Sequence, residues 1–135
     1  MRENLFRGKR KDNGEWIYGD LRHISDWLGG YNPHIVDNRN GRNNSVAGVE
    51  VDPETVGQYI GANDKNHKEI FEGDIVKSCD NFIYEIRWDN QRAMFYLRND
   101  IIHASADFYH YFASDLEIIG NIHDNEMMEG GGSND

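Results

Sequence analysis

The sequence predicts a mainly β protein that ends in a small antiparallel barrel, and three observations support this fold class. Asn13-Gly14 separates two strand-like runs, and this dipeptide is typical of the tight turn of a β-hairpin. Apolar residues recur at every second position of one segment, as on the buried face of a strand: Phe82, Tyr84, Ile86 and Trp88. Strand-like segments separated by Gly, Asn or Asp return about every 8–12 residues, which is typical of small β-barrels.

The first elements expected are the two strands of the hairpin, over residues 5–10 and 15–21. Asn and Gly both tolerate a positive φ, so we expect positive φ at both central positions of the turn. Trp16 and Tyr18, and with them Leu21, are expected on one side of the second strand.

The segment from His23 to Asn44 is predicted to be rich in loops. The run 26–33 contains two glycines and a proline and is expected to break regular structure, before a short strand over 34–37 and a further loop over 38–41. Residues 45–51 are expected as another strand. Asp52 followed by Pro53 is the pattern of an N-cap with proline at the first helical position, so a single helical or 3₁₀ turn is predicted there.

The second half is expected to form a regular succession of strands and turns. Glu72-Gly73-Asp74 is predicted as a turn that leads into a strand, and the segment 104–114, rich in aromatic residues, is predicted as a short helix or a packed loop. The strands are expected over 58–60, 69–71, 75–78, 82–88, 94–97 and 116–122, with a polar loop over 62–68.

The domain organisation follows from this order of elements. We expect an N-terminal β-rich region over 1–57, the barrel over 58–124 and a flexible acidic tail over 125–135. A chain of 135 residues with 38% hydrophobic residues can form one compact unit or two small lobes around a modest core.

Cysteine usage and hydropathy indicate a cytoplasmic protein. Cys79 is the single cysteine, so no internal disulfide can form, and we expect it to be a small buried apolar side chain and not a nucleophile. The N-terminus carries charge with no apolar run behind it, and no stretch approaches the ~18 apolar residues of a membrane helix. We therefore expect no membrane partner.

Negative charge is concentrated towards the C-terminus. The chain has 14 Lys and Arg against 24 Asp and Glu, and eight of the ten excess negative charges lie after Arg98, where there is no Lys or Arg. Nucleic-acid-binding surfaces are normally basic, so a pI of about 4.9 argues against nucleic acid as a partner. We expect a solvated acidic face and tail, and the alternative is a surface that mimics the charge of nucleic acid.

Five blocks of the sequence, spread over nearly its whole length, resemble the YopX family: 5–8, 14–21, 51–59, 64–76 and 116–123. This is a family of phage and prophage proteins without an assigned biochemical activity. The resemblance implies a C-terminal SH3-like barrel and a place in the cytoplasm of a bacterial host cell, and it transfers no catalytic residue. At His67 the family more often has glycine, so a locally different turn is implied there.

No stretch carries a catalytic or cofactor-binding signature, and we predict no catalytic, cofactor-binding or metal-ligating residues and no cofactor. The run 64–69 begins like a calcium loop, but Lys68 stands at a ligand position and Glu69 where the bend needs glycine. Gly29-Gly30 lacks the Lys-Ser/Thr of a phosphate-binding loop. Glu72 and Asp74 could in principle serve as acid and base, but carboxylates around a glycine before a strand indicate a turn.

One histidine constellation is the best metal candidate. His103, Asp107 and His110 could share a helical face at spacings of four and three. The same spacing is equally met by an exposed polar face, which we favour.

Aromatic residues in the irregular segments are the remaining lead for function: Tyr31, Phe108, Tyr109, Tyr111 and Phe112. SH3-like barrels bind peptides or assemble through such surfaces. The alternative, which we favour, is that Tyr109 or Phe112 caps the open end of the barrel.

Two functional hypotheses follow. The first is a non-enzymatic phage protein that acts through protein contacts, either as a homo-oligomer or by binding an unidentified host or phage protein. The second is a metal-dependent enzyme that uses the region of His103, Asp107 and His110.

Overall fold

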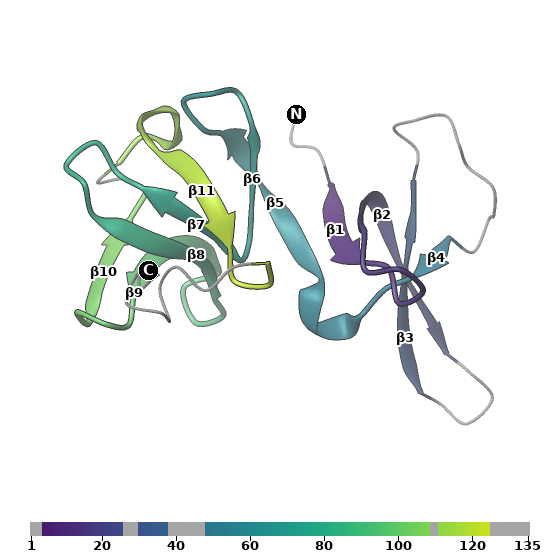
Figure 1. Cartoon of the computed structure of the whole chain (residues 1–135). Coiled ribbons are helices and arrows are strands. Elements are labelled where there is room, and N and C mark those ends of the chain that lie inside the picture. Colours follow the sequence, from purple (N-terminus) through teal and green to yellow (C-terminus); the bar gives the residue numbers. More distant parts are fainter. Residues whose placement is uncertain (1–3, 26–29, 38–47, 109–110, 125–135) are drawn as a thin grey trace. The chain divides into compact units, whose positions relative to one another are not determined.

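The computed structural model describes residues 4–25, 30–37, 48–108 and 111–124, and in this part the chain is mainly β with almost no helix. Its strands form two antiparallel sheets, with two 3₁₀ turns of three residues each (Figure 1). The chain divides into two compact units, Met1–Tyr59 and Ile60–Asp135, and β5 (Gly57–Asn63) begins in the first and ends in the second. The prediction of a mainly β protein is confirmed. None of the helices described is long and apolar enough to cross a membrane.

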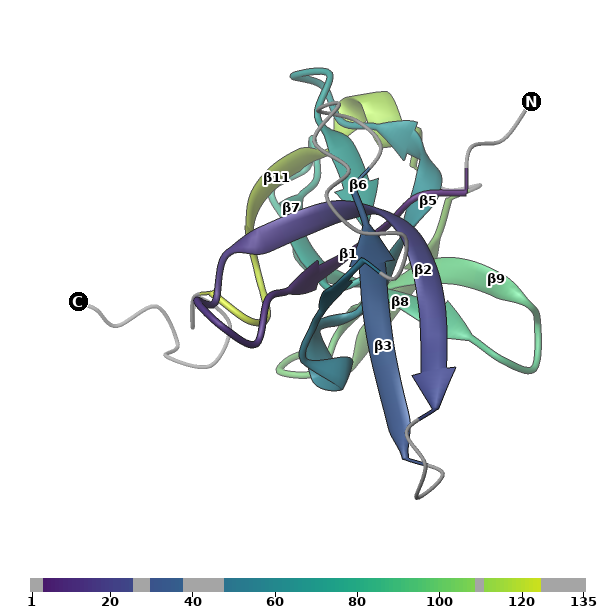
Figure 2. The ribbon, with the colours of Figure 1, turned by 90° about the vertical axis from the view of Figure 1, so that its right-hand side faces the viewer.

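The first unit is built on the antiparallel order β4-β3-β2-β1-β5. Figure 2 shows β2 and β3 side by side as its longest pair. Its core contains Ile17, Ile35 and Val51, with Leu21 packed against them. The bounds are β1 (Phe6–Lys9), β2 (Trp16–Ser25), β3 (Tyr31–Val36), β4 (Val49–Glu50) and the 3₁₀ turn η1 (Pro53–Thr55).

The β1–β2 hairpin is confirmed, but its turn differs from the prediction. The Arg10 N–H donates to the Glu15 carbonyl (2.9 Å) and the Gly14 N–H to the Arg10 carbonyl (2.8 Å), so four residues form the loop. Gly14 has a φ of 75°, whereas Asn13 does not have a positive φ. Longer hairpin loops are commonly built around a type I turn, which needs no positive φ at its centre. Asn13 acts through its side chain, whose Oδ1 accepts from the Glu15 N–H (2.9 Å).

The expected side of Leu21 was wrong. Leu21 packs in the core cluster that contains Ile17. Successive strand residues point to opposite faces, so Leu21 shares a face with Ile17 and not with Trp16 and Tyr18.

Residues 31–33 were predicted to break regular structure, but they are part of β3. The Pro33 carbonyl accepts from the Val51 N–H (3.1 Å), and this bond lies on the β4 side of the strand. The Pro33 nitrogen faces the same side as the Pro33 carbonyl, so the missing N–H donor removes no bond to β2. On the β4 side, Pro33 lies beyond the two residues of β3 that pair with β4. The strand expected over 34–37 is thus the end of a longer one.

The turn predicted at Asp52-Pro53 is confirmed as η1. The Asp52 carboxylate accepts from the Glu54 N–H (3.2 Å), with proline at the start of the turn. Of the strand predicted over 45–51, residues 49–50 form β4 and Val51 bridges to Arg10. The remainder of that segment up to Ala47, the loop predicted over 38–44 and the tail predicted over 125–135 lie outside the described residues.

The second unit contains a five-stranded sheet of order β10-β9-β8-β7-β11, with β6 beside the end of β5. Its core consists of Ile70, Val76, Tyr84, Ile86, Leu97, Tyr111 and Leu116. The bounds are β6 (Glu69–Phe71), β7 (Asp74–Lys77), β8 (Ile83–Asp89), β9 (Met94–Asn99), β10 (Ala104–Asp107), the 3₁₀ turn η2 (Ala113–Asp115) and β11 (Glu117–Asn121).

The alternating face predicted for 82–88 lies on β8, and its centre is buried. Tyr84 and Ile86 belong to the core, whereas Phe82 and Trp88, at the two ends, are 46% and 41% exposed. The turn predicted at Gly73 is also confirmed. Gly73 has a φ of 94°, and the Asp74 carboxylate accepts from the Phe71 N–H (2.8 Å).

The segment 104–114 begins as a strand, so the prediction of a helix or packed loop is wrong for its first residues. Ala104–Asp107 pairs with β9 across a turn over 100–103, in which the Asn99 Oδ1 accepts from the N–H groups of Ile101 (2.8 Å) and Ile102 (3.2 Å). Alanine has a low strand propensity, so tertiary pairing overrides the local preference here. The closing strand predicted over 116–122 is confirmed as β11.

Candidate functional site

The histidine constellation is not on a helix. His103 lies in the turn before β10 with a φ of 54°, and Asp107 ends β10. The helical spacing of four and three therefore does not bring these residues to one face, and His110 lies outside the described residues. The Asp107 carboxylate is bound by the Arg92 guanidinium (3.1 Å). Within the described ranges, no three His, Cys, Asp or Glu side chains are grouped to hold a metal ion.

The run that begins like a calcium loop is organised by a carboxylate that binds the backbone. Asp64 is 2% exposed. One of its oxygens accepts from the N–H groups of Asn66 (2.8 Å) and Lys68 (2.9 Å), and the other from the Ile118 N–H (2.9 Å). Burial acts to raise the pKa of Asp64, but these donors outweigh it and hold the pKa below 3.8. The side chain therefore ties the β5–β6 loop to β11.

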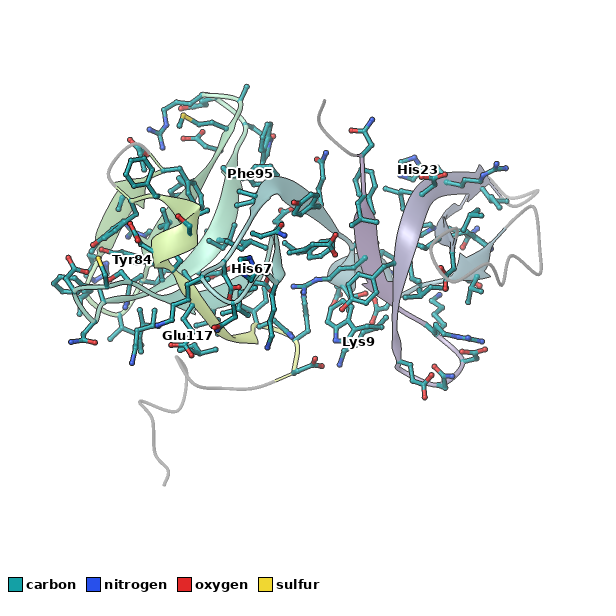
Figure 3. All side chains as sticks on the ribbon, turned by 90° about the horizontal axis from the view of Figure 1, so that it is seen from above. Lys9, His23, His67, Tyr84, Phe95 and Glu117 are labelled. Atoms are coloured by element: carbon teal, nitrogen blue, oxygen red, sulfur yellow. The ribbon has the colours of Figure 1, made fainter. Side chains whose placement is uncertain are left out.

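His67 adopts a φ of 65° in this loop (Figure 3). This is the left-handed region that glycine favours. The histidine therefore takes a backbone conformation that suits a glycine, and the expectation of a locally different turn stays a prediction.

A hydrogen-bonded network joins the β7–β8 turn to the segment before η2. The Tyr111 hydroxyl donates to both carboxylate oxygens of Asp80 (3.0 Å each) and lies 3.4 Å from the Tyr84 hydroxyl. The Ser78 hydroxyl also bonds to Asp80, and Ser78 Oγ accepts from the Phe82 N–H (3.0 Å). Burial first, and then its bond to Tyr84, raise the pKa of Tyr111 above its usual value of 10. Figure 3 labels Tyr84 within the second unit.

Two exposed aromatic rings extend from the segments that this network joins. Phe82 follows the turn and is 46% exposed, and Phe112 follows Tyr111 and is 76% exposed. We call Phe82 and Phe112 the aromatic pair. The favoured expectation was that Tyr109 or Phe112 caps a barrel end. For Phe112 it is not met, because Tyr111 takes the buried position and Phe112 the exposed one. Phe108 packs against the core, Tyr31 is the first residue of β3, and Tyr109 lies outside the described residues.

Cys79 lies in the same turn and is exposed, so the expectation of a buried apolar side chain is wrong. The Ser78 backbone bonds to Phe82 and Asn81 close the turn, and they leave Cys79 at its outer side.

Several carboxylates of the acidic C-terminal third are paired with cations. Arg87 and Arg98 bind Asp100 and lower its pKa to about 2. Glu117 lies 3.9 Å from Lys65. Together with the pair formed by Arg92 and Asp107, these contacts reduce the uncompensated charge on which a nucleic-acid mimic would depend.

Tyr111→Phe is expected to lower the free energy of unfolding by about 1 kcal/mol, because it removes the hydroxyl that binds Asp80 and leaves the packing of the ring intact. Urea denaturation of parent and variant measures this difference. Tyr96→Phe is the control, since Tyr96 lies outside the network; equal losses in the two variants would show that the network adds nothing.

Sequence reasoning missed Ser78, Asp80 and Asp64 as organising residues. A Ser-x-Asp run before an asparagine is a weak local signal of a turn. The partners, however, are 31 and 54 residues away in the chain for Tyr111–Asp80 and Asp64–Ile118, and no local pattern marks them.

Comparisons with known proteins gave a family match for the sequence and a likeness to a solved structure for the fold. The family described as "YopX protein" matches residues 5–129. Protein EF1440 from Enterococcus faecalis has a similar structure, with a TM-score of 0.60 and 21% sequence identity, and the match covers 96% of this chain and 100% of that chain. At this identity the likeness concerns the fold alone. The comparison with curated proteins gave no match. Since the family match covers most of the sequence, the chain belongs to the YopX family.

Proposed function

We propose that this protein is a non-enzymatic module of phage or prophage origin that acts through protein contacts, with a second copy of itself and with a partner in the cytoplasm of a bacterial host. The observation that carries the proposal is Phe112. A large apolar ring that is 76% exposed has a cost in water, and it follows directly on a tyrosine that is 7% exposed.

The network that joins the two segments carrying Phe82 and Phe112 supports a binding role. Aromatic residues are enriched at the centre of protein interfaces, and those that are held in place before binding lose less entropy when the partner arrives. The bonds from Tyr111 to Asp80 hold together the two segments from which these rings extend. The two segments are therefore already ordered before binding, and their ordering subtracts little from the free energy of binding.

We also propose that residues 58–124 form an SH3-like barrel, preceded by the β-rich region 1–57 and followed by a flexible tail over 125–135. Two observations support the barrel. The order β11-β7-β8-β9-β10 places the last strand beside the first strand of the meander, and a 3₁₀ turn, η2, precedes that last strand. Fold alone does not decide function, so the protein-binding proposal rests on the aromatic pair.

The geometry does not favour the metal-dependent alternative, because His103 lies in a turn and the carboxylate of Asp107, at the end of β10, binds Arg92.

Phe112→Ala is expected to weaken partner binding at least tenfold, because truncation of an exposed aromatic at an interface typically costs more than 1 kcal/mol. The measurement is affinity purification of the tagged full chain from host-cell extract, with each co-purified protein quantified.

Ser114→Ala is the matched control, since Ser114 is also exposed and lies two residues away. Both variants should melt like the parent. Co-purified proteins recovered in equal amounts with the parent and with Phe112→Ala would contradict the proposed surface.

A further inference from the structure

The two edges of the five-stranded sheet differ in what covers them. β11 forms one edge and β10 the other (Figure 1). On β11, the Ile118 N–H is bound by Asp64 (2.9 Å), and the Leu116 carbonyl just before it accepts from the Lys65 N–H (2.9 Å). β11 also has a register shift between Ile118 and Gly120. Bulges and covering loops are the usual protection of an edge strand, so β11 is closed to a further strand.

Among the described residues, the edge of β10 has no register shift, and a single backbone bond covers it, at the Asp107 carbonyl. Its sequence, Ala-Ser-Ala-Asp, contains no lysine or proline, and its pairing with β9 is regular over all four residues. The small side chains leave the backbone accessible to an approaching strand.

The outward direction of the β10 backbone follows from one hydrogen bond. The Asp107 carbonyl accepts from the Tyr111 N–H (3.3 Å), so it is turned away from β9. In an antiparallel ladder the residues alternate between those that bond to the neighbouring strand and those that do not. The N–H and C=O groups of Ser105 therefore point to the same open edge, while those of Ala104 and Ala106 point to β9.

We propose that two copies of this chain pair antiparallel along β10, with Ser105 of each copy opposite Ser105 of the other. This inference deepens the proposed self-association by naming its interface. Ser105 would exchange two reciprocal N–H···O bonds across the two-fold axis, as an isologous interface requires. In the alternative register, Ser105 of one copy would lie opposite Asp107 of the other. That register would need the Asp107 carbonyl as an acceptor at its centre, and this carbonyl already accepts from the Tyr111 N–H.

The residues that this register places opposite one another are complementary, which favours a second copy as the occupant. Ala104 lies across from Ala106 of the second copy, so small residues meet small ones. His103, a hydrogen-bond donor, lies across from Asp107, whose carboxylate also binds Arg92. Ile102, which is 53% exposed, lies towards Phe108 of the other copy. A head-to-tail ring through β10 and β11 is excluded by the covered edge of β11.

Ser105→Pro tests this interface, because proline removes the outward N–H without removing a bond to β9. Light scattering on the full chain at tens of micromolar is expected to give twice 15.6 kDa for the parent and 15.6 kDa for Ser105→Pro. Ser105→Ala is the matched control. It loses the bond from the Arg98 guanidinium to Ser105 Oγ but keeps the N–H, and it should remain a dimer.

A second experiment stands even if the proline variant fails to fold. Facing residues of a hydrogen-bonded antiparallel pair have Cα atoms about 5.5 Å apart, within the range that a disulfide spans. Ser105→Cys in a Cys79→Ser background, treated with oxidised glutathione, should give a covalent dimer, and Ser114→Cys in the same background should not. If the parent is a monomer and the Ser105→Cys variant gives no cross-link, both this interface and the proposed self-association are overturned. If the parent is a dimer, the Ser105→Cys variant gives no cross-link and the Ser105→Pro variant is still a dimer, the proposed interface alone is overturned.

Discussion

Asp64→Ala is expected to lower the free energy of unfolding by about 2–4 kcal/mol, because it leaves three backbone N–H groups without their acceptor. Asn66 and Lys68 are exposed, so water can replace part of what their N–H groups lose, whereas Ile118 is half-buried. The loss should therefore come mainly from the connection to β11. Chemical denaturation followed by fluorescence measures it.

Asp64→Asn is the matched control. Its amide oxygen can still accept from Asn66 and Lys68, but its amide nitrogen would face the Ile118 N–H, so an intermediate loss is expected. An Asp64→Ala variant as stable as the parent would show that water satisfies all three donors.

The stabilisation by Asp64 should also depend on pH. Its folded pKa lies below the usual 3.8, so the unfolded chain binds the proton more readily. The contribution is complete above the unfolded pKa and is lost as the pH falls through the folded one. The difference in unfolding free energy between the parent and Asp64→Asn should be constant from pH 7 to about 5 and shrink below about 4. A difference that grows with acid would contradict the assigned bonds.

Gly19→Ala is expected to destabilise the first unit by about 3 kcal/mol or more, since overpacking against backbone cannot be relieved by a rotamer change. A Cβ at Gly19 would stand 1.9 Å from the Val36 carbonyl oxygen, on the neighbouring strand β3. Hydrogen exchange should therefore quicken in β2 and β3.

Gly14→Ala separates this clash from the general cost of replacing glycine. Its Cβ would meet nothing within 4 Å, and only the φ of +75° opposes it, so a loss of about 1 kcal/mol is expected. Equal exchange rates in the Gly19→Ala and Gly14→Ala variants would show that the β2–β3 contact is not as close as described.

The features that could be predicted from the sequence are those whose chemistry is local. The cap at Asp52 with Pro53, the turn at Gly73 and the alternation around Tyr84 each depend on residues within a few positions of one another. They were therefore readable from sequence without knowledge of the fold.

The features that were missed depend on partners far along the chain. Pro33 fits inside β3 because its nitrogen faces away from β2, on the side where β4 pairs with only two residues of β3. Ala104–Asp107 is a strand because β9 lies beside it. The same holds for the surface, since Phe112 is exposed because Tyr111 reaches Asp80 across 31 residues. Sequence reasoning named both Tyr111 and Phe112 as candidates, but it could not tell that Tyr111 is the buried one.

The central claim, that this protein works by contacting other proteins through its aromatic pair, is tested most directly by photo-cross-linking in the host cell. A photoreactive phenylalanine analogue replaces Phe112 in the full chain, and the same analogue at Ser114 is the control. A discrete cross-linked product is expected from position 112, either with a partner or with a second copy, and a much weaker one from position 114. No cross-linked product from position 112, in a chain that is folded and expressed at the parent's level, would contradict it.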